Sequence, residues 1–151
     1  DAKNKFQKKY PIAQNAVQLQ QGTVMDLYPT ILSVAHVKSP KHYALDGADL
    51  KKLLQGKEDK NHRDDFLMHF PHGEHRANYF TTYRKGDWKL IYYYNPETTG
   101  IPTWKLYNLK DDPYETSELS AKYPEKTASM IELMKNRLTE ENALYPITEN
   151  K

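Results

Sequence analysis

Apolar and polar residues alternate in the central part of the chain, with the period of two that is typical of strands buried on one side. In the first alternating stretch, Phe66, Met68 and Phe70 share one face. Lys85-Gly86-Asp87 interrupts the pattern with residues suited to a tight hairpin turn. The sequence therefore predicts four antiparallel strands, at residues 66–70, 78–84, 88–94 and 103–109.

Apolar residues spaced three and four apart predict helices on both sides of the strands. One helix is expected at 25–35, a shorter one at 50–55 and a C-terminal one from Pro124 to about Asn142. Residues 1–21 follow neither period, so we expect an irregular segment with a short strand at 16–19. The stripe of the first helix that should face the core consists of Leu27, Ile31, Leu32, Val34 and Ala35.

These elements predict an α+β fold, with a small four-stranded antiparallel sheet packed against a long C-terminal helix plus shorter helices. A length of 151 residues is usual for a single domain, so we expect one compact body. Within it we expect an irregular segment at 1–23, the folded region at 24–146 and a tail at 147–151.

Charge and cysteine content exclude several classes of function. The 22 basic and 20 acidic residues are interspersed, and a formal net charge of +2 gives no field that favours nucleic acid. The chain has no cysteine, which excludes disulfides, zinc-thiolate sites and a thiol nucleophile. No apolar run approaches the ~20 residues of a membrane span. The start at Asp1, without Met or a signal peptide, indicates a chain that begins inside a longer protein or has been processed.

Four stretches follow one another along the chain: Val24-Met25-Asp26-Leu27-Tyr28-Pro29-Thr30-Ile31-Leu32, Leu45-Asp46-Gly47-Ala48-Asp49-Leu50 through Gly56, Arg84-Lys85-Gly86-Asp87-Trp88-Lys89-Leu90-Ile91, and Leu106-Tyr107-Asn108-Leu109 with Asp112-Pro113-Tyr114-Glu115. In this order they resemble the C-terminal region of sulfatases of the alkaline-phosphatase-like superfamily, in particular bacterial glycan sulfatases. The resemblance extends from Val24 to the C-terminal helix, ending near Pro146, and implies a C-terminal sulfatase subdomain at 24–146.

The histidines form the most informative polar cluster. His69, His72 and His75 recur every third residue, and Arg76 follows them. The three histidines could bind zinc, or His69 could be a core residue with His72 and His75 exposed. Alternatively, the imidazoles and the guanidinium could bind hydroxyl, carboxylate or sulfate groups of a sugar. The stretch 68–72 resembles the His-x-Pro-His segment of many glycan sulfatases, which implies that these four residues bind substrate.

The remaining matched residues are expected to have structural roles. Asp26 is expected to cap a helix, Asp46-Gly47 to form a turn and Gly86-Asp87 to form the hairpin tip. Asp111, Asp112 and Glu115 would supply only three carboxylates to a calcium loop, which needs six or more oxygens. We therefore expect no metal ligand among them.

The resemblance also implies where the chemistry resides. Sulfatases attack sulfur with a formylglycine made in a Cys/Ser-x-Pro-x-Arg motif and hold calcium with Asp and Asn residues of the N-terminal domain. This chain has no such motif, so we expect no catalytic residue and no cofactor in it. It would act as the catalytically silent C-terminal part of a sulfuric ester hydrolase, with the N-terminal sulfatase domain and a sulfated glycan as partners. A periplasmic or secreted parent is implied.

A second hypothesis treats the chain as a free-standing carbohydrate- or protein-binding module. Tyr92, Tyr93, Tyr94 and Trp104 could then provide a stacking platform. Tyrosine-rich strands more commonly place one face in the core and the other at the surface. The residues that precede Asp1 in the parent sequence discriminate between the two hypotheses.

Overall fold

The computed structural model describes residues 2–39, 41–71, 79–94, 100 and 102–145. The chain divides into two compact units, Asp1–Asp64 and Asp65–Lys151, where its length predicted one body. A chain can bury two small cores when each has its own helices or strands, and here the division falls at the start of the first strand. The predicted boundaries at residues 23 and 146 stay predictions.

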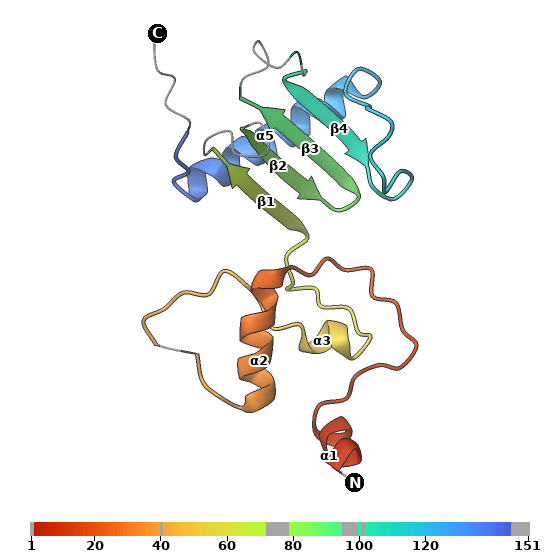
Figure 1. Ribbon diagram of the computed structural model, residues 1–151, viewed down its shortest axis with the longest axis vertical. Coiled ribbons are helices and arrows are strands. Elements are labelled where there is room, and N and C mark those ends of the chain that lie inside the picture. Colours follow the sequence, from red (N-terminus) through yellow and green to blue (C-terminus); the bar gives the residue numbers. More distant parts are fainter. Residues whose placement is uncertain (1, 40, 72–78, 95–99, 101, 146–151) are drawn as a thin grey trace. The chain divides into compact units, whose positions relative to one another are not determined.

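The second unit contains the predicted sheet and the long helix. Its strands are β1 (Asp65–Phe70), β2 (Phe80–Lys85), β3 (Trp88–Tyr93) and β4 (Trp104–Asn108), followed by helix α5 (Pro124–Glu140). The strands are antiparallel and lie in the order β1-β2-β3-β4. Figure 1 shows α5 lying along one face of this sheet. This arrangement confirms the α+β fold and its four-stranded antiparallel sheet.

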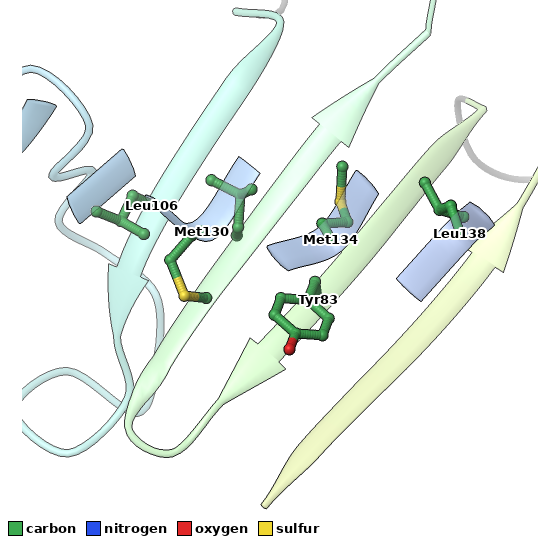
Figure 2. Packing of buried hydrophobic residues seen from close by; sticks show 6 residues of the cluster. Tyr83, Leu106, Met130, Met134 and Leu138 are labelled. Atoms are coloured by element: carbon green, nitrogen blue, oxygen red, sulfur yellow. The ribbon is translucent and has the colours of Figure 1, made fainter. Parts of the chain in front are cut away.

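The core of this unit lies between α5 and the sheet, as Figure 2 shows. From α5, residues spaced four apart enter it, because that spacing keeps side chains on one side of a helix. Each large apolar side chain that is fully buried stabilises the fold by about 1.5–3 kcal/mol. The buried cluster consists of Tyr83, Leu90 and Leu106 from the sheet and Met130, Met134 and Leu138 from α5.

The two faces of β1 differ in their surroundings. Leu67 packs against the core cluster beneath α5. The alternating residues Met68 and Phe70 are exposed and, with Phe66, belong to the opposite face. The predicted alternation is therefore present. The residue that joins the core is Leu67, which lies between Phe66 and Met68 in the strand.

The hairpin between β2 and β3 has the predicted turn. Lys85 pairs with Trp88, so that only Gly86 and Asp87 form the connection. Gly86 has a φ of 56°, which a residue with a side chain adopts only with strain. The outer edge of β4 is covered by residues 118–119, because the Leu106 N–H donates to Glu118 Oε1 at 3.0 Å and the Leu119 N–H donates to the Leu106 carbonyl at 2.9 Å.

The first unit contains α1 (Ala2–Lys9), the short 3-10 helix η1 (Val24–Asp26), α2 (Leu27–Ala35) and α3 (Lys51–Leu54). Helix α1 contradicts the prediction of an irregular start, and residues 16–19 form no strand. The rings of Phe6 and Tyr10, four residues apart, stack with centroids 6.2 Å apart, and Tyr10 is buried. This aromatic contact stabilises a helix whose other residues are mostly polar.

The sequence predicted that the apolar stripe of α2 faces the core, and this prediction is wrong, because none of its five residues is buried. Leu27 and Ile31 are exposed, Leu32 and Val34 are half-buried, and Thr30 is the buried residue of this helix. Thr30 is held inside because its hydroxyl donates to the Asp26 carbonyl at 2.6 Å and accepts from the Leu50 N–H at 2.9 Å.

No helix within the part of the chain that the structure describes is long and apolar enough to cross a membrane.

Candidate functional site

His69 lies near the end of β1, as predicted, and both of its ring nitrogens have partners within the chain. Nε2 lies 2.6 Å from the carbonyl oxygen of Leu144. Nδ1 lies 2.7 Å from Thr81 Oγ1 and 3.3 Å from the phenol oxygen of Tyr94. A carbonyl oxygen can only accept a hydrogen bond, so in the neutral ring Nε2 carries the proton and Nδ1 accepts from a hydroxyl.

Thr81 connects His69 to Tyr94 inside the sheet. The Thr81 side chain is fully buried, and its Oγ1 lies 2.7 Å from both His69 Nδ1 and the Tyr94 hydroxyl. Burial raises the pKa of the Tyr94 phenol above its ordinary value, although the hydrogen bond with Thr81 opposes the shift. Tyr94 therefore keeps its proton near neutral pH and can donate it to Thr81, which in turn donates to His69.

Aromatic rings surround this hydrogen-bonded group. The Tyr145 ring packs edge-on against His69, with centroids 5.9 Å apart, and against Tyr94 at 6.2 Å. Tyr94 contacts Tyr92 at 4.6 Å, and Tyr92 contacts Trp104 at 4.4 Å. The contacts of Tyr145 with His69 and Tyr94, and of Tyr94 with Tyr92, are edge-on, which aligns the positive edge of one ring with the negative face of the other, whereas the rings of Tyr92 and Trp104 are tilted by 36°.

The end of α5 directs the chain back to His69. Asn142 has a φ of 50°, and its N–H donates to the Thr139 carbonyl at 3.1 Å. The Ala143 N–H donates to the Leu138 carbonyl at 2.9 Å, which completes a Schellman motif, and Ala143 packs against the core cluster. This turn brings the Leu144 carbonyl and the Tyr145 ring to the end of β1.

The structure places one of the four predicted substrate-binding residues. His72, His75 and Arg76 lie outside the described residues, and their role stays a prediction. For His69 the sequence showed the strand end but none of the partners, because Thr81, Leu144 and Tyr145 are far from it in the chain. The one sequence signal was the tyrosine run that contains Tyr94.

The proposed stacking platform is not a single surface. Tyr92 and Trp104 pack against the core cluster beneath α5. Tyr93 points to the other face of the sheet, because side chains alternate along β3. There Lys105 Nζ lies 5.6 Å from the centroid of the Tyr93 ring. The strands thus divide their aromatic residues between the two faces.

Asp26 organises a separate cluster in the first unit. Its carboxylate is 1% exposed and accepts from the Thr23 N–H at 2.7 Å, the Thr23 hydroxyl at 3.0 Å and the Ala48 N–H at 2.8 Å. Burial opposes ionisation, but these hydrogen bonds outweigh it and hold the pKa of Asp26 below its ordinary value. Asp26 precedes α2 as predicted, yet its side chain makes no capping bond to that helix and instead joins it to the loop at Ala48.

Gly47 allows this close approach. A Cβ at Gly47 would lie 2.1 Å from the Met25 carbonyl oxygen and 2.7 Å from the Asp26 nitrogen, so no other residue fits without moving the backbone. Beside this contact lies an open, largely apolar hollow of about 610 Å³. It is lined by Met25, Tyr28, Pro29, Tyr43, Leu45, Asp46 and Gly47.

The three carboxylates considered for calcium have partners within the protein. Asp111 accepts from the Asn108 side chain at 2.8 Å, Asp112 accepts from the Ser117 N–H at 2.8 Å, and Glu115 forms an ion pair with Lys89 at 2.7 Å. Among the residues described by the structure, no group of three or more His, Cys, Asp or Glu side chains could hold a metal ion. These side chains therefore fit a structural role.

The comparisons with known proteins agree with this fold. A sulfatase of Formosa agariphila is 34% identical over 146 residues, covering 86% of this chain and 25% of the relative. An uncharacterised sulfatase of Schizosaccharomyces pombe is 34% identical over 121 residues, covering 73% of this chain and 20% of the relative. The chain thus spans a fifth to a quarter of the length of these relatives.

A solved structure supports the same relationship. The protein BT4656, solved in complex with its substrate D-glucosamine-2-N,6-O-disulfate, is 29% identical with a TM-score of 0.59, covering 76% of this chain and 23% of that chain. The family model described as "N-sulphoglucosamine sulphohydrolase, C-terminal" matches residues 3–143. Because this match includes nearly all the helices and strands described above, the chain belongs to the family of sulfatase C-terminal domains.

Proposed function

We propose that this chain is the C-terminal part of a sulfatase that hydrolyses sulfate esters on a glycan. It would provide structural support and contacts to the substrate, and it would be catalytically inactive alone. The family match and the similarity to sulfatases about three and a half times its length support the first point. The similarity to BT4656, which was solved in complex with a disulfated glucosamine as its substrate, supports a sulfated saccharide as the substrate class.

The chemistry of sulfate transfer would then reside in the portion of the parent that precedes this chain. A nucleophile derived from Cys or Ser and a calcium ion are expected there, as the resemblance implies. The carboxylates considered for a calcium loop, Asp111, Asp112 and Glu115, already have partners within the chain, which are Asn108, Ser117 and Lys89 respectively. We therefore assign the chain no step at sulfur.

The observation that carries the contribution to the substrate site is the fixed position of His69. With both ring nitrogens bonded inside the chain, His69 orients the end of β1, from which the segment with His72, His75 and Arg76 continues. A strand end that is fixed before binding reduces the ordering that substrate binding would require of β1. His69 would act as the positioning residue, and His72, His75 and Arg76 as the groups that contact hydroxyl or sulfate oxygens.

The experiment that tests this proposal is the determination of the parent sequence before Asp1, with mass spectrometry of the purified parent. The proposal expects a Cys/Ser-x-Pro-x-Arg motif upstream and a formylglycine at its first position. A parent that starts with its own Met near Asp1, or that carries no such motif, would favour the free-standing binding module instead.

A further inference from the structure

Helix α2 exposes the residues that its sequence would place in a core. Val24 is 79% exposed, Leu27 51%, Tyr28 50% and Ile31 63%. They are spaced three and four apart and therefore lie along one side of η1 and α2. The buried positions of the same two elements are the polar residues Asp26 and Thr30. The usual distribution of a surface helix, with polar residues outside, is reversed.

The exposed stripe continues into the hollow described above. Tyr28 belongs to both, and Tyr43, which lines the hollow, is 68% exposed. We call Val24, Leu27, Tyr28 and Ile31 together with this hollow the α2 surface. Its extent exceeds the scattered single apolar residues that a protein surface normally carries.

The α2 surface is rigidly built. The Asp26 carboxylate bonds to the Ala48 N–H, Thr30 bonds to the Leu50 N–H, and Gly47 contacts the Met25 carbonyl. These contacts fix the wall of the hollow to the helix before any partner binds. A preformed apolar hollow beside an apolar helix suits a partner that inserts aliphatic or aromatic side chains. Because the backbone of the α2 surface is already fixed, binding costs little conformational entropy in this chain.

We propose that the α2 surface docks onto the portion of the parent that precedes this chain. The inference rests on the proposed function, and it identifies the surface that the C-terminal part uses. The occupant is inferred from the length of the relatives, which are about three and a half times as long as this chain, and from the family match, which includes the whole of α2. The docking segment of the parent should present apolar side chains to Ile31 and to the hollow, with few charges.

The lack of cysteine in this chain allows a direct test. Ile31→Cys places a single thiol on the α2 surface, and Glu58→Cys places one on the exposed, charged stretch around residue 58 as a matched control. Each variant is prepared in the isolated chain and in the full-length parent. Labelling by a maleimide is then followed by peptide mass spectrometry, so that thiols elsewhere in the parent do not interfere.

In the isolated chain the two thiols should react at rates within about threefold of each other. In the parent, the thiol at position 31 should react at least about tenfold more slowly than the one at position 58, because it is covered. Equal labelling of both positions in a folded parent would overturn the docking surface. Protection in the isolated chain that grows with protein concentration would assign the surface to a second copy instead, and would also overturn it.

Sulfate release from a sulfated glucosamine saccharide, measured on the same parent, separates the two proposals. A parent that releases sulfate but leaves position 31 reactive contradicts the docking surface alone. A parent that protects position 31 but hydrolyses no sulfate ester keeps the docking surface and contradicts the proposed activity.

Discussion

The imidazole Nε2 of His69 lies 2.6 Å from the carbonyl oxygen of Leu144, 75 residues further along the chain. The contact joins the end of β1 to the segment that leaves α5, and Tyr145 packs on the same ring. Three separate parts of the second unit therefore meet at one imidazole, because Thr81 on β2 bonds to its other nitrogen. The orientation of the strand end depends on this ring.

Replacement of His69 by Ala should lower kcat/KM of the parent on its sulfated saccharide by roughly 10- to 1000-fold, with a much smaller loss on a small aryl sulfate. The aryl ester has no sugar hydroxyls that need to be aligned. His69→Ala should also destabilise the chain by about 1–3 kcal/mol, since it removes the acceptor of the buried Thr81 hydroxyl, which then keeps only the hydrogen bond with Tyr94.

His72→Ala provides the matched comparison for His69→Ala. If His72 contacts the substrate directly, this variant should show the same loss on the saccharide without a change in melting temperature. Equal losses on both substrates would instead give these histidines a part in the chemistry, such as protonation of the leaving oxygen. Unchanged rates on both substrates would remove them from the substrate site.

Gly47→Ala should destabilise the first unit by about 1–3 kcal/mol or more, because the added methyl would lie 2.1 Å from the Met25 carbonyl oxygen. Gly22→Ala is the control within the same unit, since its methyl would meet only the Leu50 side chain at 3.6 Å. Amide hydrogen exchange at Ala48 and Leu50 measures the difference. Similar exchange in both variants would show that the loop at Gly47 is not held against Met25.

The stability of the first unit should depend on pH through Asp26. The pKa of Asp26 is lowered in the folded chain, so its contribution is complete above the unfolded value of about 3.9 and is lost as the pH falls through the folded value. Asp26→Asn cannot titrate, so its Ala48 amide should exchange faster at neutral pH and show less additional loss of protection below about pH 4. Parallel pH profiles for the two proteins would contradict the role of this carboxylate.

Asn142 should tolerate glycine but not a β-branched residue. Its φ of 50° costs a side chain such as Val about 1–2 kcal/mol, whereas glycine adopts it freely. Asn142→Val should therefore destabilise the second unit, with a transition that Trp88 and Trp104 report by fluorescence, while Asn142→Gly should change it little. Equal stability of the two variants would show that the Schellman motif does not hold the end of α5.

The strands and α5 could be predicted because their signals are local. Gly86-Asp87 marks a hairpin by its own turn chemistry, and the spacing of Met130, Met134 and Leu138 defines the buried side of a helix. Helix α1 was missed because its apolar content in the helix is mainly Phe6, which finds its stacking partner in Tyr10 just beyond the last turn. Such a short contact is too little to establish a period.

The candidate site and the exposure of α2 could not be predicted from spacing. The spacing of Leu27 and Ile31 indicates that this side of the helix is apolar. It does not indicate whether residues of this chain or of another part of the parent cover it. His69 could be placed at a strand end, whereas its contacts with Thr81 and Leu144 depend on the register of β1 with β2 and on the turn at Asn142. Both are properties of the folded chain.

The release of inorganic sulfate tests the central claim most directly, with D-glucosamine-2-N,6-O-disulfate as the first substrate and an aryl sulfate as the second. Both the full-length parent and this chain alone are assayed with calcium present. We expect release by the parent and none above buffer by the isolated chain, because the chain lacks the Cys/Ser-x-Pro-x-Arg motif from which the nucleophile would be made. Turnover by the isolated chain that survives repurification and is abolished by a substitution within it would contradict a catalytically silent C-terminal part. A correctly modified parent that releases no sulfate from any ester would contradict a sulfatase parent.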